Sequence, residues 1–579
     1  MRGSHVRRRD FCGAVLAGAA SARDNGRPNI LWLIGEDLCP DLGCYGNSIV
    51  HTPNIDRLAR EGTRFDNVFC TGPICSPSRS GIATGVYQTS IDAHHQRIHR
   101  DDGYQPPPPI RVFTHLLREA GYHTSNVLKP APGVRGTGKT DFNFHAENIF
   151  DGDDWSQRKS GQPFYAQVNF SDAHRTFRRF APAIDPAKVQ LPPYLPDYPA
   201  VREDWTMYLE SIQALDDNIG KVLERLEREG LAQNTIVVFF GDNGCEMPRG
   251  KTTVYDRGIH VPLIVRFPGK HLPRSVQPGS VRRDLASLFD ITATTLEWAG
   301  VRTPGWMDAR PLFGPRAKPR EHVISARDRC DWSVDRVRSV RTERYKYVRN
   351  FMPERPYWQH DPYMDVANIP LIVARQLDQE GKLTAAQKLV TAQRRPEEEL
   401  YDLKADPHEI RNVAADPANA AELRRLRSIL TDWIRTSGDK GEIPEKGLPK
   451  QYDHWALVDG WASAGECTLR KVPGALRLEG SGKRDLIRCG LVAPGGRFRL
   501  ELRIKGAKPA GLSIAWGAVT DPANPKNRVP LQAGDFAEFD VPGHLAWVGF
   551  ELTGTNQVLK LSSIRLTRAG ETLREWRFR

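Results

Sequence analysis

The chain has 579 residues, of which 39% are hydrophobic, and its 82 Lys and Arg against 70 Asp and Glu give a net charge of +12. This composition is that of a globular protein and excludes intrinsic disorder and a collagen-like repeat. Charges mostly alternate in sign, and no Lys/Arg-rich run with interleaved aromatics occurs, so the positive balance predicts an anionic substrate rather than nucleic acid.

The first 22 residues have the features of an export signal. A charged stretch at Arg7 to Arg9 precedes a short apolar run from Phe11 to Ala20, which ends in the small-residue cleavage pattern Ala20-Ser21-Ala22. The Arg8-Arg9-x-Phe11 arrangement resembles a twin-arginine signal. No apolar run reaches the roughly 18 residues of a membrane span. We therefore expect an exported protein, periplasmic or extracellular, with a disordered N-terminus as the alternative.

The nine cysteines include no C-x-x-C pair and no zinc-finger spacing. This excludes a disulfide framework and a zinc cage. Cys39 with Cys44, and Cys467 with Cys489, remain candidates for disulfide bonds after export.

Three apolar runs predict buried strands of a parallel sheet: Asn29 to Ile34, Phe164 to Phe170 and Thr235 to Phe240. Between the last two, apolar residues recur with helical spacing from Tyr208 to Leu226, and Gly230 ends that helix. Strands that alternate with helices predict an α/β sandwich with a mainly parallel central sheet.

Polar and ionisable residues follow each of these strands. They are Gly35-Glu36-Asp37, Ser171-Asp172-Ala173-His174 and Gly241-Asp242-Asn243-Gly244. Ligands of open α/β sheets gather at the carboxyl ends of strands, so we expect the active site there. One such segment is explained by an ordinary loop cap, but three together favour a site.

The pattern changes beyond residue 320. A short strand signal from Tyr345 to Val348 and a helix from about Ala420 to Ile434 predict a smaller α+β subdomain, followed by a Gly- and Pro-rich linker from Gly438 to Pro449. Alternating stretches such as Phe498 to Ile504 predict a β-sandwich appendage. The expected units are a signal peptide at 1–22, a catalytic α/β domain at 27–320, the subdomain at 321–440 and the appendage at 453–579.

The segment Cys75-Ser76-Pro77-Ser78-Arg79 carries the most specific chemistry. A cysteine just before a Pro-led helix start, with backbone N–H groups and Arg79 nearby, favours an anion or a thiolate. By itself the segment fits a cysteine nucleophile or a structural cysteine. C-x-P-x-R is also the signature of the sulfatases, whose cysteine is oxidised to formylglycine, and the chain resembles this family.

The resemblance extends from about residue 27 to 440 and implies an alkaline-phosphatase-like fold, a formylglycine derived from Cys75, one divalent ion, usually Ca²⁺, and a formylglycine-generating maturation enzyme as partner. It assigns the metal to Glu36, Asp37, Cys75, Asp242 and Asn243. Oxygen-bearing side chains of this kind suit a hard cation. It assigns catalysis to Cys75, Arg79, Lys139, Asp141, His174 and Lys251.

The mechanism implied by the resemblance starts from the geminal diol of formylglycine. One hydroxyl, activated by the metal and Arg79, attacks sulfur, while His174 and Lys251 assist the leaving group. The second hydroxyl then expels sulfate and restores the aldehyde.

Gly133 to Thr140 fits the phosphate-binding pattern G-x-x-x-x-G-K-[ST] and by itself predicts an NTPase. Pro130 and Pro132 break the run before it and no helical period follows, so we expect a coincidental match. In the sulfatase resemblance, Gly138-Lys139 completes the second family signature after an insertion, with Lys129 as a rival for the lysine role. Asp141 stands where the family usually has a histidine; a carboxylate can accept a proton there but cannot donate as imidazolium does.

Leu191 to Pro199 and Glu398 to Glu409 resemble the heparan N-sulfatase (sulfamidase) branch. This implies a sulfated saccharide as substrate, either N-sulfoglucosamine or an O-sulfated sugar. A phosphodiester or phosphonate hydrolase on the same fold is the second hypothesis, and an inactive binding protein a remote third.

Candidates for sugar contacts are His94, His95 and the run Arg327 to Arg329. The appendage tryptophans can stack on sugars, although we expect core packing for most of them. They are Trp455, Trp461, Trp516 and Trp547.

Overall fold

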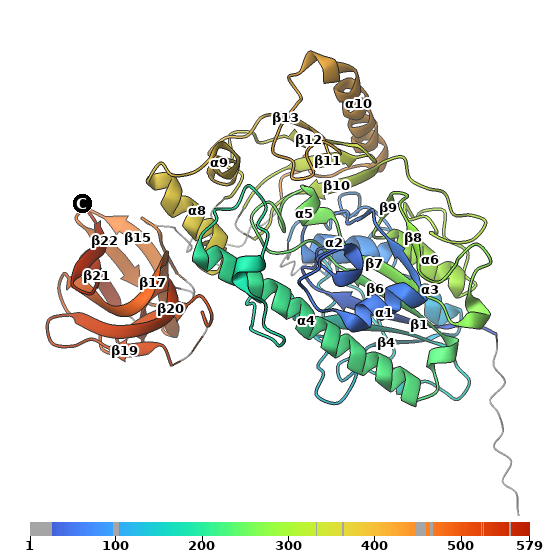
Figure 1. The fold of residues 1–579 in the computed structure, drawn as a ribbon, viewed down its shortest axis with the longest axis horizontal. Coiled ribbons are helices and arrows are strands. Elements are labelled where there is room, and N and C mark those ends of the chain that lie inside the picture. The colour runs from blue at the N-terminus through green and yellow to red at the C-terminus, as the bar shows by residue number, and fades with distance from the viewer. Residues whose placement is uncertain are drawn as a thin grey trace, which may run out of the picture.

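The computed structural model describes residues 26–96, 103–331, 333–359, 361, 364–445, 459–463, 467–522, 524, 526–554 and 557–579 (Figure 1). The predicted signal peptide and Trp455 lie outside these ranges. Within them, none of the helices combines the length and apolar character that crossing a membrane requires.

A seven-stranded sheet forms the centre of the molecule, in the order β4-β5-β1-β6-β7-β2-β8. Its strands are β1 (Asn29–Gly35), β2 (Thr63–Phe65), β4 (His123–Asn126), β5 (Phe164–Phe170), β6 (Thr235–Gly241), β7 (Leu263–Arg266) and β8 (Ser280–Arg282). Strands β4, β5, β1 and β6 run parallel to one another, and β7 is antiparallel to both of its neighbours. The predicted strands and the mainly parallel sheet are confirmed.

Helices cover both faces of this sheet (Figure 1). The α-helices of the described residues are α1 (Pro53–Glu61), α2 (Cys75–Thr84), α3 (Phe113–Glu119), α4 (Pro199–Arg228), α5 (Asp256–Ile259), α6 (Asp290–Trp298), α7 (Met364–Ala367), α8 (Ile369–Gln379), α9 (Ala385–Thr391) and α10 (Ala420–Ser437), of which α8, α9 and α10 lie away from this sheet. Side chains of β1 alternate: Leu31 and Leu33 pack in the core with α4, whereas Trp32 packs in the core with α3 and α6. The predicted sandwich follows from this two-sided burial.

The strongly periodic helix is longer than predicted. Helix α4 begins at Pro199, nine residues before the first predicted core position at Tyr208. Proline is favoured in the first helical turn because its missing N–H needs no partner there.

Two smaller sheets complete the part that precedes the linker. The antiparallel sheet β10-β11-β12-β13 lies against α10, and β3 pairs with β9. Their bounds are β3 (Val68–Phe69), β9 (Ala286–Ser287), β10 (Val323–Arg327), β11 (Val337–Arg341), β12 (Tyr345–Asn350) and β13 (Glu398–Asp402). The predicted strand near Tyr345 and the predicted helix near Ala420 are both present.

The C-terminal residues form a nine-stranded antiparallel sheet around its own apolar core. The strands are β14 (Trp461–Ser463), β15 (Thr468–Val472), β16 (Ala475–Glu479), β17 (Arg484–Ile504), β18 (Ser513–Ala518), β19 (Arg528–Pro530), β20 (Phe536–Thr553), β21 (Val558–Arg568) and β22 (Glu571–Arg577). Trp461, Trp516 and Trp547 are buried, which confirms core packing over sugar stacking. We propose the division at 27–320, 321–440 and 453–579 for the folded units.

The appendage packs against the rest of the chain through apolar and polar contacts. Trp547 belongs to the same buried cluster as Ile372 of α8. The Gln376 side chain accepts a hydrogen bond from the Val492 N–H at 2.9 Å and donates to the Val492 carbonyl at 3.1 Å. These contacts between the appendage and α8 predict that the appendage stabilises the catalytic region.

We expect Trp547→Ala to lower the free energy of unfolding by about 3–5 kcal/mol, because it opens a cavity in the shared core. Urea unfolding of the full chain measures the change. The control is Leu573→Ala, at a leucine that is 41% exposed on the appendage. If Trp547→Ala lowers the free energy of unfolding no more than the control does, the contacts between the appendage and α8 are not stabilising.

Candidate active site

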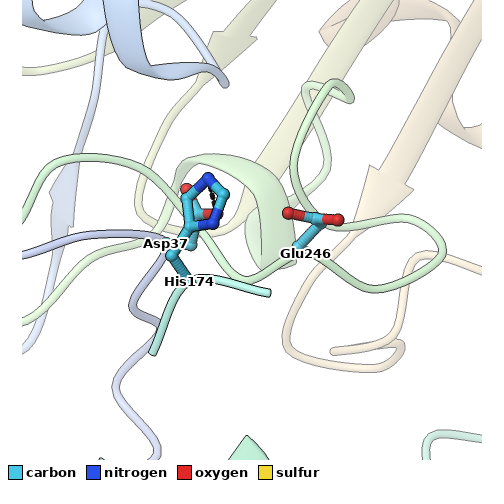
Figure 2. Close-up of side chains that lie close together, drawn as sticks. All are labelled: Asp37, His174 and Glu246. Atoms are coloured by element: carbon cyan, nitrogen blue, oxygen red, sulfur yellow. Dashed lines mark ion pairs between the residues drawn. The ribbon is translucent and has the colours of Figure 1, made fainter. Parts of the chain in front are cut away.

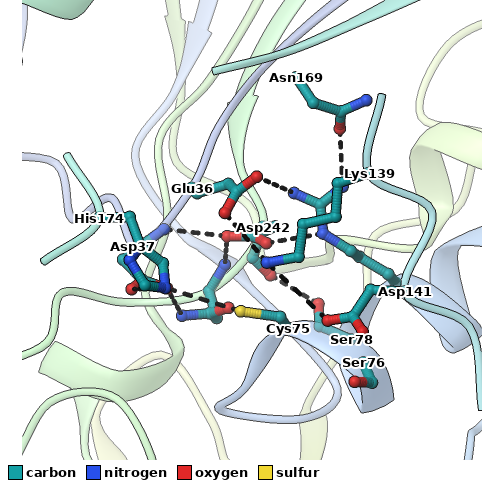
Figure 3. A network of polar contacts seen from close by, with 12 residues as sticks. Glu36, Asp37, Cys75, Ser76, Ser78, Lys139, Asp141, Asn169, His174 and Asp242 are labelled. Atoms are coloured by element: carbon teal, nitrogen blue, oxygen red, sulfur yellow. Dashed lines mark hydrogen bonds and ion pairs between the residues drawn. The ribbon is translucent and has the colours of Figure 1, made fainter. Parts of the chain in front are cut away.

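Three parallel strands end at one level and bring their following residues together. Gly35 at the end of β1 lies opposite Phe170 of β5 and Gly241 of β6. Backbone hydrogen bonds continue past the strands, from the Glu36 N–H to the Phe170 carbonyl at 3.0 Å and from the Asp242 N–H to the Gly35 carbonyl at 3.2 Å. The side chains of Glu36, Asp37, His174 and Asp242 therefore converge (Figure 3).

Helix α2 points its first residue, Cys75, at this cluster. All ten of its residues are buried. The Ser78 hydroxyl donates to the Asp242 carbonyl at 2.6 Å, and the Ser76 N–H and hydroxyl both donate to the Gln96 side-chain carbonyl, at 3.2 and 3.0 Å. These bonds fix the helix start, so the Cys75 sulfur lies 3.8 Å from Asp37 Oδ1.

Arg79 lies one helical turn after Cys75 and therefore on the same face of α2. Its Nε donates to Asp242 at 2.9 Å and its Nη1 to the Asn169 side chain at 2.7 Å, while Nη2 is 3.7 Å from Glu36. The sequence analysis missed Asn169, because a polar residue inside an apolar strand run carries no motif.

The predicted metal ligands form a buried acidic cluster. Glu36, Asp37 and Asp242 are at most 3% exposed. The Asn243 amide nitrogen donates to Asp37 Oδ1 at 2.9 Å, and Asn243 Oδ1 is buried and accepts no hydrogen bond from the described residues. Burial raises the pKa of the Asp242 carboxyl, Arg79 opposes this, and Asp37 adds to it. Three carboxylates and a free amide oxygen fit a hard divalent cation.

Of the two rival lysines, the structure brings Lys139 to this cluster. Lys139 Nζ lies 3.0 Å from Glu36 Oε2 and 3.8 Å from Asp141 Oδ2. Lys129 is exposed and lines an open surface cavity with Pro132 and Arg225. Residues 127–154, all described, contain no strand and no helix after the phosphate-loop pattern, so that match is coincidental as expected.

His174 and Lys251 both lie next to Asp37. His174 Nδ1 is 2.6 Å from the Arg175 carbonyl. Since a carbonyl only accepts, Nδ1 carries the proton and Nε2 faces the site. Lys251 Nζ lies 2.7 Å from Asp37 Oδ2 and 3.5 Å from His174 Nε2. Burial lowers the pKa of Lys251, but Asp37, Cys75 and Glu246 together outweigh burial, so the pKa lies well above its usual value.

The thiol of Cys75 is a poor nucleophile as it stands. Burial raises its pKa to about 12, and Lys251 and Lys139 only partly oppose this. The protonated form therefore dominates at neutral pH, which disfavours the thiolate alternative.

Glu246 is a further residue of the site that the sequence analysis missed. The ligand atoms of Asp37, His174 and Glu246 lie within 4.8 Å of one another (Figure 2). Glu246 follows Asp242 by four residues in the loop after β6, but side chains in irregular loops follow no period that predicts their direction.

Three of the candidates for sugar contacts, His94, Arg327 and Arg329, are buried. His94 is 2% exposed and packs against the His95 ring, with centroids 4.2 Å apart. Arg327 and Arg329 are also buried and pair with Asp335 and Glu445. The described cysteines are free, so neither predicted disulfide is present. Cys39 instead accepts a hydrogen bond from the Cys245 N–H at 3.1 Å.

Comparison with known proteins identifies the family of the chain. The model of the sulfatase family matches residues 28–130 and 136–301, and the C-terminal model of N-sulphoglucosamine sulphohydrolase matches residues 249–376. The chain belongs to the sulfatase family, which are hydrolases of sulfate esters or sulfamates.

Two curated relatives cover most of the chain. It is 34% identical to an ulvan-active sulfatase of Formosa agariphila, over 73% of this chain and 77% of that protein. It is 28% identical to the human N-sulphoglucosamine sulphohydrolase, over 70% of this chain and 89% of that protein. The second relative agrees with the sulfamidase-like branch expected from the sequence.

Two solved structures show the same fold. BT1596, a 2-O GAG sulfatase, is 19% identical, with a TM-score of 0.53 over 74% of this chain and 96% of that chain. The phosphonate monoester hydrolase of Silicibacter pomeroyi is also 19% identical, with a TM-score of 0.51 over 75% of this chain and 98% of that chain. The alkaline-phosphatase-like fold is confirmed.

We expect Lys139→Ala to lower kcat/KM about 100-fold, because it removes a half-buried cation from a site proposed to bind an anionic group. Lys129→Ala, on the surface, is the matched control and should change kcat/KM less than about twofold. Steady-state rates on a sulfated sugar measure both. A larger loss of kcat/KM for Lys129→Ala than for Lys139→Ala would assign the anion-binding role to Lys129.

We expect His94 to destabilise the fold in acid. Burial, with Arg338, lowers its pKa from 6.5 to about 4. The unfolded chain therefore binds a proton that the folded chain does not, and stability falls as the pH drops from 6.5 towards 4, by about 3 kcal/mol in total. Urea unfolding at pH 7.5 and 4.5 should show a smaller acid loss for His94→Gln than for wild type. His51→Gln, at an exposed histidine, should leave the loss unchanged.

Proposed function

We propose that this protein removes sulfate from sulfated saccharides by cleaving a sulfate ester or a sulfamate, with Cys75 converted to formylglycine and one Ca²⁺ ion held by Glu36, Asp37, Asp242 and Asn243. The observation that carries the proposal is the contact of Cys75 with a buried acidic cluster whose carboxylates pair with the cations Arg79, Lys139 and Lys251. Fixed cations around one reacting atom suit a transferring anionic group. The names of the two relatives support a sulfated substrate.

The cation supplies charge stabilisation at a sulfate oxygen, and formylglycine supplies both the attacking hydroxyl and the hydroxyl that releases sulfate. The chain's own residues orient the substrate. Arg79 is held in place by Asp242 and Asn169, so its guanidinium is preorganised beside residue 75. Lys139 pairs with Glu36 and Lys251 with Asp37, and both ammonium groups offset charge on the sulfate oxygens in this proposal.

Proton transfer is divided between His174 and Asp141 in this proposal. His174 Nε2 faces the site because Nδ1 donates its proton to the Arg175 carbonyl. In this proposal the ring takes up a second proton at Nε2, and that imidazolium gives it to the leaving oxygen or nitrogen. Asp141 lies beside Lys139 and takes the place of the usual family histidine as a proton acceptor.

The proposal includes two partners outside this chain. A formylglycine-generating maturation enzyme oxidises Cys75, and the twin-arginine-like N-terminus directs the protein to the periplasm or the medium. A sulfated saccharide, N-sulfated or O-sulfated, is the substrate. A phosphonate or phosphodiester hydrolase is the second hypothesis, favoured only by the shared fold.

The peptide that contains Cys75 should carry an aldehyde in place of the thiol when the protein is made in its native host, as mass spectrometry of that peptide measures. The modified protein should release sulfate from N-sulfoglucosamine or from O-sulfated sugars, lose activity with a chelator and regain it with Ca²⁺. Faster release of phosphate or phosphonate from the corresponding esters selects the second hypothesis.

Cys75→Ser should lower turnover at least about 1,000-fold when no serine-oxidising maturase is present, because a single hydroxyl cannot both attack sulfur and expel sulfate. Sulfate release under saturating substrate measures the change. Cys70→Ser, at a nearby buried thiol in the loop that follows β3, controls for loss of packing. Normal turnover by Cys75→Ser contradicts the formylglycine mechanism.

A further inference from the structure

The Lys251 ammonium lies in the middle of three acceptors. Its Nζ is 2.7 Å from Asp37 Oδ2, 3.5 Å from His174 Nε2 and 3.6 Å from Glu246 Oε2. These acceptors come from the loops after β1, β5 and β6 (Figure 2). The convergence of Asp37, His174 and Glu246 is therefore filled by a lysine ammonium and is not a second metal site.

The contact between Lys251 and Asp37 conflicts with the proposed cation site. Asp37 is fully buried and is one of the proposed Ca²⁺ ligands. A divalent cation on Asp37 repels an ammonium that is hydrogen-bonded to the same carboxylate, and the low dielectric of a buried site strengthens that repulsion. Lys251 therefore needs another anion once Asp37 is occupied.

Glu246 has unused capacity to accept the ammonium. It is completely buried, and neither carboxylate oxygen accepts a hydrogen bond from the described residues. A buried carboxylate without hydrogen-bond donors is unfavourable unless it has a partner in another state of the protein. Its Oε2 is already within 3.6 Å of Lys251 Nζ, so a small movement of the lysine side chain closes the bond.

The second cation near Glu246 is largely committed elsewhere. Arg175 Nε lies 3.6 Å from Glu246 Oε1. Its two terminal nitrogens donate to Asp204 at 2.7 and 2.9 Å, and also to the Ala367 and Glu246 backbone carbonyls. Arg175 thus holds the carboxylate in place, while Oε2 remains directed at Lys251.

We propose that Glu246 is a positioning residue that receives the Lys251 ammonium when a divalent cation takes Asp37. Cation binding and the orientation of Lys251 are then coupled, because the lysine moves from Asp37 to Glu246 and stays beside His174. This inference rests on the proposed cation site and extends it by assigning a role to Glu246.

The test is calcium affinity, measured by isothermal titration calorimetry on chelator-stripped full-length protein. Glu246→Gln should weaken Ca²⁺ binding about tenfold, since the ammonium then has no carboxylate to move to. Glu246→Asp, which keeps the charge, should recover most of the affinity. The surface control Glu224→Gln should bind as wild type does.

A double-mutant cycle separates this coupling from direct contact of Glu246 with the cation. In a Lys251→Met background the ammonium is absent, so Glu246→Gln should change the Ca²⁺ affinity less than about twofold. An equal tenfold loss of Ca²⁺ affinity in both backgrounds overturns the proposal. Glu246 would then act on the cation directly, as a ligand or through its negative charge. Wild-type affinity in Glu246→Gln also overturns it.

Two further readouts keep the outcomes distinct. Thermal unfolding without Ca²⁺ reports whether Glu246→Gln folds; a lower melting temperature with unchanged Ca²⁺ affinity means a structural role only and overturns the proposal. Wild-type protein that binds no Ca²⁺ overturns both the inference and the proposed cation site. Wild-type Ca²⁺ binding with unaltered affinity in the variant overturns the inference alone.

Discussion

The active site depends on the shared register of three parallel strands. Because Gly35 lies opposite both Phe170 and Gly241, strands β1, β5 and β6 end at one level. The residues that follow the three strands therefore lie close together. Backbone hydrogen bonds beyond the strand ends hold these loops against one another without any contribution from side chains. A slip in register would move the acidic cluster apart and turn buried side chains to the other face.

This convergence concentrates buried charge, and the site is stable only because opposite charges are interleaved. Asp37 is buried, which by itself raises the pKa of its carboxyl, yet Lys251 and His174 hold that pKa well below its usual range. The same contact holds the pKa of Lys251 well above its usual value. A divalent cation that binds here therefore has to displace ammonium groups, and the protein needs carboxylates such as Glu246 to receive them.

Much of the fold and part of the site are predictable from the sequence, for identifiable reasons. Strand β1, helix α4 and the polar residues after each strand follow from periodicity and from the rule that sites lie at the carboxyl ends of strands. The choice between Lys129 and Lys139 does not follow from the sequence, because both lysines lie in an irregular segment where sequence spacing does not determine the direction of a side chain. Glu246 was missed for the same reason, whereas Asn169 was missed because a polar residue within an apolar strand carries no motif. Arg327, a candidate for sugar contacts, proved to be buried and paired with Asp335, and His94 proved to be buried against His95.

The shared fold alone does not choose between sulfate and phosphonate chemistry, since hydrolases of both kinds have it. The choice lies with side chains that differ in charge at fixed places. A carboxylate at position 141, beside Lys139, adds a negative group at one side of the cluster. Next to Asp37, the Lys251 ammonium supplies hydrogen-bond donors beside His174. In the proposed mechanism the transferring group meets an asymmetric field, with proton acceptance by Asp141 near Lys139 and proton donation by His174 near Lys251, and this asymmetry sets the side from which the leaving group departs.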